Sequence, residues 1–154
     1  MAKKFAVKKG STFSPGKGKT WSDKINSDKP HEVKKNEKGF ADITPGSSML
    51  IATPKIVDDY VRQIPKGKEV TLQTMRKDLA TEYNADYTCP VTAGIFLRIV
   101  AEAAHEQYSK GKPLSKITPF WRVIDENSTI GKKVSFGSDF IKQQRVKEGL
   151  NKEK

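Results

Sequence analysis

The sequence predicts a mainly α-helical domain of the winged-helix type, with a helix-turn-helix, a short β or wing segment after it, and a flexible basic arm before it. Three observations lead to this prediction. Apolar residues recur at helical spacing in several segments after residue 40. A β-branched and aromatic segment follows the longest of them. The first 39 residues hold only isolated apolar side chains. We therefore expect a disordered basic arm over 1–39 and a folded domain over 40–150.

Capping residues and periodicity together place four helices. Thr53 and Pro54 match the N-cap and first position of a helix. Thr71 is suited to cap a second helix, Pro90 to begin a third, and Ser138 to cap a last one. The predicted helices cover 54–63, 72–83, 91–109 and 139–148.

The segments between these helices predict turns and one strand. Residues 40–48 and 125–137 are typical of loops. Residues 117–124 are rich in β-branched and aromatic side chains, which favours a short strand or a packed extended loop. A shorter helix, a turn, a longer helix and then a β segment is the order of a helix-turn-helix domain with a wing.

The charge of the chain favours a polyanionic partner. The 154 residues carry 29 Lys and Arg against 18 Asp and Glu, a net charge of +11. Residues 1–39 hold 11 lysines and four acidic residues, so the arm has most of this excess. Such a charge attracts nucleic acid. We predict DNA as the partner, with the arm either a clamp on DNA or a solubilising tail.

Cysteine content and hydropathy bear on the compartment. A single cysteine, Cys89, excludes a disulfide within the chain, which is typical of a reducing compartment. No apolar run reaches the roughly 18 residues that a membrane span needs. The sequence predicts a cytoplasmic, nucleoid-associated monomer with no membrane, metal or cofactor.

Three stretches resemble one protein family. They are the segment Ile64–Thr71, the segment Gly111–Ile124 with its Pro-Phe-Trp-Arg-Val sequence, and the stretch Gly137–Gly149 with its closing Glu-Gly. Together they resemble the C-terminal, DNA-binding and reactive domain of alkylguanine-DNA alkyltransferases. The likeness covers about residues 53–150 and is closest to the inactive alkyltransferase-like proteins. It implies a winged-helix DNA-binding domain.

The reactive residues of that family are replaced in this sequence. The resemblance implies a cysteine acceptor and a histidine base after Pro119, but Phe120 and Trp121 stand there and only Arg122 is retained. The expected glutamate of the last helix falls on Lys142. A benzyl group cannot accept an alkyl group and an indole N–H cannot take up a proton, so suicide alkyl transfer at this site is excluded.

Two interpretations of the degenerate motif remain open. Phe120 and Trp121 either form an aromatic pocket for a flipped or damaged base, or they pack in the core where the reactive centre used to be. Arg122 either orients a phosphate or holds the turn through hydrogen bonds.

The start of the third helix is the predicted DNA face. Thr88, Thr92 and Gly94 offer small or hydroxyl side chains beside free helix N–H groups, which suits close approach to phosphates. Arg98 stands alone between Lys77 and Lys110 as a base or phosphate contact. Alternatively, Thr88 only caps the helix and Arg98 pairs with Glu102.

The sequence therefore predicts a non-enzymatic DNA-binding protein, with damaged DNA as a candidate target. Two alternatives stay open. The first is an enzyme of different chemistry that uses Cys89, a candidate nucleophile at a helix N-terminus, or a pocket at Trp121 and Arg122. The second is a protein-interaction module on the same fold.

Overall fold

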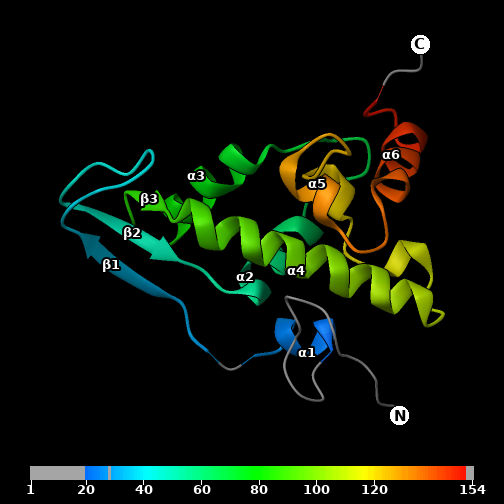
Figure 1. The fold of residues 1–154 in the computed structure, drawn as a ribbon, viewed down its shortest axis with the longest axis horizontal. Helices are drawn as coiled ribbons and strands as arrows, with labels where there is room; N and C mark the ends of the chain where they lie inside the picture. The colour runs from blue at the N-terminus through cyan, green and yellow to red at the C-terminus, as the bar shows by residue number, and fades with distance from the viewer. Residues whose placement is uncertain (1–19, 28, 152–154) are drawn as a thin grey trace.

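The described part of the chain is mainly helical and is built around one long helix, α4 (Figure 1). The computed structural model describes residues 20–27 and 29–151. The helices are α1 (Trp21–Ile25), α2 (Pro54–Arg62), α3 (Leu72–Glu82), α4 (Pro90–Ser109), α5 (Thr129–Lys133) and α6 (Ser138–Lys147), with two 3-10 turns, η1 (Leu114–Lys116) and η2 (Phe120–Arg122). The strands are β1 (Glu32–Asn36), β2 (Ser47–Ile51) and β3 (Tyr87–Thr88).

The four helices expected from periodicity are confirmed as α2, α3, α4 and α6. The hydroxyl of Thr53 accepts a hydrogen bond from the N–H of Ile56 at 3.1 Å, and that of Thr71 accepts one from Thr74 at 3.0 Å. Both residues therefore cap their helices as predicted. The cap of α6 is Gly137 with φ +89°, so the assignment of Ser138 as the cap was wrong.

A small sheet lies at the N-terminal end of α4 (Figure 1). Its strand order is β1-β2-β3, with β1 antiparallel to β2 and β2 parallel to β3. The N–H of Cys89, the N-cap of α4, donates to the carbonyl of Leu50 in β2 at 2.8 Å. This bond continues the pairing of β2 with β3, so the sheet fixes where α4 begins.

The prediction of a disordered arm over 1–39 was wrong for the part that the structure describes. Residues 20–39 contain α1 and β1. Trp21 packs against the core and Ile25 is buried in it. The N–H and hydroxyl of Ser22 both donate to Glu106 in α4, at 3.1 and 2.9 Å. Docking onto α4 supplies the apolar partners that the segment lacks by itself. Residues 1–19 of the predicted arm lie outside the described residues.

Of the two alternatives for residues 117–124, a short strand or a packed extended loop, the strand was wrong. This stretch runs into the 3-10 turn η2. The N–H of Val70 donates to the carbonyl of Arg122 at 2.9 Å, and Arg145 donates to the carbonyl of Trp121 at 2.8 Å. Tertiary hydrogen bonds therefore replace a strand ladder, and the apolar side chains serve burial rather than pairing.

The turn-like stretch 125–137 contains the short helix α5. A Cβ on Gly131 would lie 2.1 Å from the carbonyl oxygen of Asp125, so only glycine allows this close approach.

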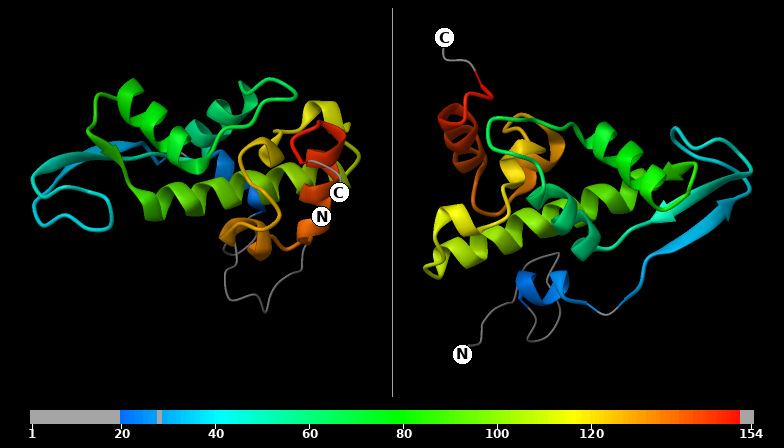
Figure 2. Two further views of the ribbon diagram at one scale, coloured as in Figure 1. Left: turned by 90° about the horizontal axis from the view of Figure 1, so that it is seen from above. Right: turned by 180° about the vertical axis from the view of Figure 1, so that it is seen from behind.

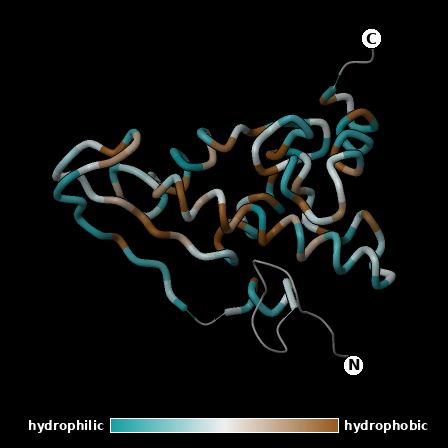
Figure 3. The backbone as a smooth tube through the Cα atoms, viewed as in Figure 1, coloured by the Kyte–Doolittle hydropathy of each residue, from teal (hydrophilic) through white to brown (hydrophobic). Residues whose placement is uncertain are grey.

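The core runs along α4, where apolar residues alternate with polar ones in the hydropathy colouring (Figure 3). Among the described residues, no helix is both long and apolar enough to cross a membrane. The largest fully buried side chains include Phe120, Leu50, Met75, Leu79, Leu97, Ile124 and Ile141.

Candidate nucleic-acid interface

The N-terminal half of α4 is partly uncovered. Val91 and Ile95, four residues apart on the same face, are 58% and 46% exposed. Cys89 is the N-cap and provides no side-chain hydrogen bond, so no side chain of the cap satisfies the first N–H groups of α4. Seen from above, the N-terminal half of α4, the β1–β2 loop and α5 reach the same side of the molecule (Figure 2, left).

The two threonines of the predicted DNA face do not present their hydroxyls to solvent. Thr88 is 1% exposed and its hydroxyl donates to the carbonyl of Arg76 at 2.7 Å. The hydroxyl oxygen of Thr92 is buried and has no hydrogen-bond partner in the described part of the chain. Direct contact of either hydroxyl with a phosphate therefore does not follow from this structure. Thr88 does not cap α4 either, because Cys89 is its N-cap.

Gly94 lies on the side of α4 that faces α5. A Cβ built on it would meet the δ-methyl of Ile130 at 3.9 Å, an ordinary contact. Two exposed lysines, Lys132 and Lys133, stand in the last turn of α5. Gly94 therefore lies where the N-terminal half of α4 meets α5, the helix that carries these two lysines.

Arg98 makes the local ion pair that was the alternative to a DNA contact. Its Nε lies 3.3 Å from the carboxylate of Glu102, and its guanidinium lies 5.9 Å from the centre of the Trp21 ring. Glu102 is 2% exposed and also accepts hydrogen bonds from the N–H and hydroxyl of Ser135. Arg98 thus compensates a buried charge that links α4 to the segment after α5.

The most exposed residues of this face, Val91 and Ile95, were not singled out from the sequence. Both are apolar, so the apolar periodicity that predicts this helix does not distinguish them from its core-facing residues. The signal in the sequence that could have identified them is how widely the apolar residues are spread around the helix axis. They cover more of the α4 circumference than one core-facing stripe needs.

The segment Pro119–Arg122, for which the sequence left a base pocket and core packing open, lies in the core. Phe120 is fully buried and Trp121 is 3% exposed. The ring centre of Phe120 lies 5.1 to 5.9 Å from those of Trp121, Phe136 and Phe140. The structure thus has the core-packing arrangement, and no face of the Phe120 ring is open to a base.

Arg122 is held in a buried ion pair. Its Nε and Nη2 each donate to Glu148 at 2.8 Å, and its Nη1 donates to the carbonyl of Ile64 at 2.7 Å. The indole N–H of Trp121 donates to the same carboxylate at 2.9 Å. Burial opposes ionisation of Glu148, but the hydrogen bonds from Arg122 and Trp121 outweigh it and hold its carboxyl pKa below the ordinary value. Arg122 therefore ties η2 to the end of α6 and is not free to orient a phosphate.

Cys89 has the environment of a structural cysteine. It is 5% exposed and packs with Ile43 and Met49. In the described ranges, no three His, Cys, Asp or Glu side chains gather closely enough to hold a metal ion. A buried thiol without an adjacent base gives no support to chemistry at Cys89.

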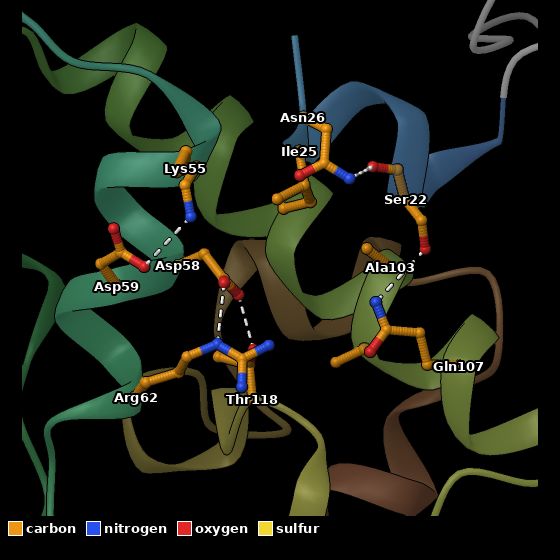
Figure 4. A pocket seen from close by; sticks show the side chains of 11 residues that line it. Ser22, Ile25, Asn26, Lys55, Asp58, Asp59, Arg62, Ala103, Gln107 and Thr118 are labelled. Carbon is orange, nitrogen blue, oxygen red and sulfur yellow. Dashed lines mark hydrogen bonds and ion pairs between the residues drawn. The ribbon is translucent and has the colours of Figure 1, made fainter.

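A polar cavity of about 230 Å³ lies between α1, α2 and α4 (Figure 4). Its charged groups pair with each other. Asp58 accepts from Arg62 at 2.9 Å and from Thr118 at 2.5 Å, and Lys55 lies 3.6 Å from Asp59. These pairs satisfy the polar lining internally, so no set of free groups converges on a ligand.

No family model, curated protein or solved structure matches the chain.

Proposed function

We propose that the protein is a non-enzymatic DNA-binding protein. In this proposal α3 and α4 form the helix-turn-helix of a winged-helix domain related to the alkyltransferase-like proteins. The observation that carries the proposal is the uncovered N-terminal half of α4, where Val91 and Ile95 are exposed and the cap leaves the helix N–H groups without a side-chain acceptor.

The chemistry of this surface suits a duplex. The N-terminal residues of a recognition helix meet base edges in the major groove, where apolar side chains contact thymine methyl groups. Free N–H groups at a helix N-terminus donate to phosphates. The net charge of +11 supplies the sequence-independent part of the binding energy.

The connection between α3 and α4 is longer than a tight helix-turn-helix turn, which has three or four residues. It runs over residues 83–89 and contains β3. Pairing of β3 with β2 holds the start of α4, and this pairing replaces the geometric constraint of a tight turn.

Ile95→Glu tests the proposal, because it places a negative charge on the exposed face with little loss of packing. Repulsion from phosphates should weaken binding to a short duplex about tenfold or more, roughly 1.4 kcal/mol. Ser109→Glu is the matched control, since it adds the same charge to an exposed site about 20 Å along the same helix. Fluorescence anisotropy across a salt series measures both variants.

Equal affinity of the wild type, Ile95→Glu and Ser109→Glu would contradict this proposal. The same titration compares plain and alkylguanine duplexes. Because Phe120 and Trp121 are buried, we expect similar affinities for the two. A strong preference for the alkylated duplex would indicate a base pocket elsewhere on the protein.

A protein-interaction surface on the same face is the second candidate. The exposure of two branched apolar side chains, Val91 and Ile95, favours it, since such residues often mark a docking site. The two candidates separate at low salt. If the wild-type protein does not bind DNA at low salt, the protein-interaction function becomes the better proposal. The third class, an enzyme that uses Cys89, has no support from the buried thiol.

A further inference from the structure

The loop that joins β1 to β2, residues 37–46, is well fixed although it projects from the molecule (Figure 1). The side-chain oxygen of Asn36 accepts from the N–H of Gly39 at 2.7 Å, and the backbone carbonyl of Asn36 accepts from the N–H of Gly46 at 2.6 Å. The hydroxyls of Thr44 and Tyr87 share a hydrogen bond of 2.8 Å. These bonds fix the loop at both ends and in its middle.

Arg76 connects this loop to the start of α4. Its two terminal nitrogens donate to the carboxylate of Asp42 at 2.9 and 2.8 Å. Its Nε donates to the carbonyl of Thr88 at 3.0 Å, one residue before the cap of α4. Ile43 of the loop also packs with Cys89, the cap itself. The loop and the N-terminus of α4 therefore form one rigid unit.

The loop presents an aromatic ring and one lysine outward, together with Glu37 and with Asp42, which is paired with Arg76. Phe40 is 40% exposed at the tip, next to the exposed Lys38, and β1 adds the exposed Lys34 and Lys35. Ala41 beside Phe40 has φ +51°, a conformation that non-glycine residues rarely adopt. A rigid loop that keeps a large apolar side chain in solvent through a strained backbone is typical of a contact surface.

We infer that the loop 37–46 forms a second DNA contact beside α4, with Phe40 against the sugars or base edges of the minor groove and Lys38 on a flanking phosphate. The inference rests on the proposed DNA binding by α4. Apolar wedges flanked by basic side chains are the means by which proteins contact the minor groove. The loop and the uncovered half of α4 reach the same side of the molecule, so one duplex can touch both (Figure 2, left).

Two variants of the full-length chain test this contact on a short fluorescein-labelled duplex. Lys38→Glu should weaken binding and make the slope of log K against log salt shallower by about one unit, because a phosphate contact is lost. Phe40→Ala should weaken binding several-fold without changing that slope. Lys110→Glu, with the same charge change at the far end of α4, should leave the slope as in the wild type. Thermal unfolding of each variant checks that the fold is retained.

The outcomes separate this inference from the function on which it rests. If Ile95→Glu weakens binding while Lys38→Glu and Phe40→Ala match the wild type, the second contact is overturned and DNA binding by α4 stands. If Ile95→Glu is silent, the proposed function fails and this inference fails with it. Weaker binding by all three variants, with Lys110→Glu unchanged in slope, supports one surface formed by α4 and the loop.

Discussion

Phe120 is a fully buried side chain that carries no reactive group. Its ring fills the centre of an aromatic cluster, and His105 stacks on the neighbouring Phe136 with ring centres 4.1 Å apart. The carboxylate beside this cluster, Glu148, is occupied by Arg122 and Trp121. A cysteine introduced at 120 would thus lie in the core without a base, and a buried thiol remains protonated and inert.

We therefore predict that neither the wild type nor Phe120→Cys accepts an alkyl group from alkylguanine DNA. Incubation with an alkylated oligonucleotide followed by intact-mass measurement checks both proteins. Phe120→Cys should also lower the free energy of unfolding by up to about 3–5 kcal/mol, since it leaves a cavity in the core. A mass shift of one alkyl group on the variant would show that a base is present after all. A shift on the wild type would identify Cys89 as reactive.

At the scale of elements, α1 and β1 are parts of the folded domain. The hydroxyl of Thr20 and the carboxylate of Asp23 form a capping box around α1. Ile25 is buried, and β1 pairs with β2 over five residues. Removal of these elements uncovers part of the α4 surface and leaves β2 as an unprotected edge strand.

Two truncations test this assignment. Deletion of residues 1–39 should lower the free energy of unfolding by about 3 kcal/mol or more, because the burial of one isoleucine alone contributes roughly 1.5–3 kcal/mol. Deletion of residues 1–19 should leave cooperative unfolding unchanged and make the salt dependence of DNA binding shallower, because that segment carries six lysines and no acidic residue. Urea denaturation and the duplex titration measure the two effects. Equal stability of both truncations would contradict the structural role of α1 and β1.

The elements that the sequence predicted correctly are those whose signal is local. Thr53, Thr71 and the apolar periodicity behind them are enough to place α2 and α3. The strand β1 has no such signal, because all but its last residue are exposed and its pairing partner lies more than ten residues further along the chain. The segment around Phe120 has the composition of a strand but is held in a turn by Arg145 and Val70, which no local pattern indicates.

The proposed site stays on the helix that the sequence indicated, but the structure changes which of its side chains are exposed to a partner. The position of α4 along the chain follows from the sequence, and its N-terminal half exposes Val91 and Ile95. Which side chains of that half are exposed depends on α3, α5 and the loop 37–46, all of which pack around it through contacts distant in sequence. The hydroxyl of Thr88 thus donates to the backbone carbonyl of Arg76, and Arg98 forms an ion pair with the buried carboxylate of Glu102.

At the scale of the whole molecule, the buried and paired acids make stability depend on pH. Burial opposes ionisation of Glu148 and Glu126, but hydrogen bonds from Arg122 and Trp121 in the first case and Asn151 in the second lower both pKa values. A hydrogen bond from Arg76 lowers the pKa of Asp42 in the same direction. Burial lowers the pKa of His105 below its ordinary 6.5, although Glu102 acts against this. In every case the unfolded chain binds protons more readily than the folded one.

The sign of the pH dependence follows from these shifts. Each carboxyl whose pKa is lower in the folded protein adds stability. This stability is complete above the pKa of the group in the unfolded chain, near 4.5 for a glutamate, and it is lost as the pH falls through the pKa in the folded protein. The lowered pKa of His105 adds stability that begins to be lost below about 6.5, where the unfolded imidazole takes up a proton first. We predict a shallow loss of stability on acidification below about pH 6.5 and a steeper one below about pH 4.5, measured by urea denaturation between about pH 3 and pH 8.

Glu148→Gln identifies the main carboxyl in the acid range. The variant leaves Arg122 without its charged partner in a largely buried site, so at neutral pH it should lower the free energy of unfolding by about 3–5 kcal/mol. Its stability should then fall less between about pH 5 and pH 3 than that of the wild type, since the group that takes up the proton is gone. Glu37→Gln, at an exposed loop position, is the control and should follow the wild-type curve. If Glu148→Gln lost stability on acidification as steeply as the wild type, the acid sensitivity would come from other carboxylates, and the prediction for Glu148 would be wrong.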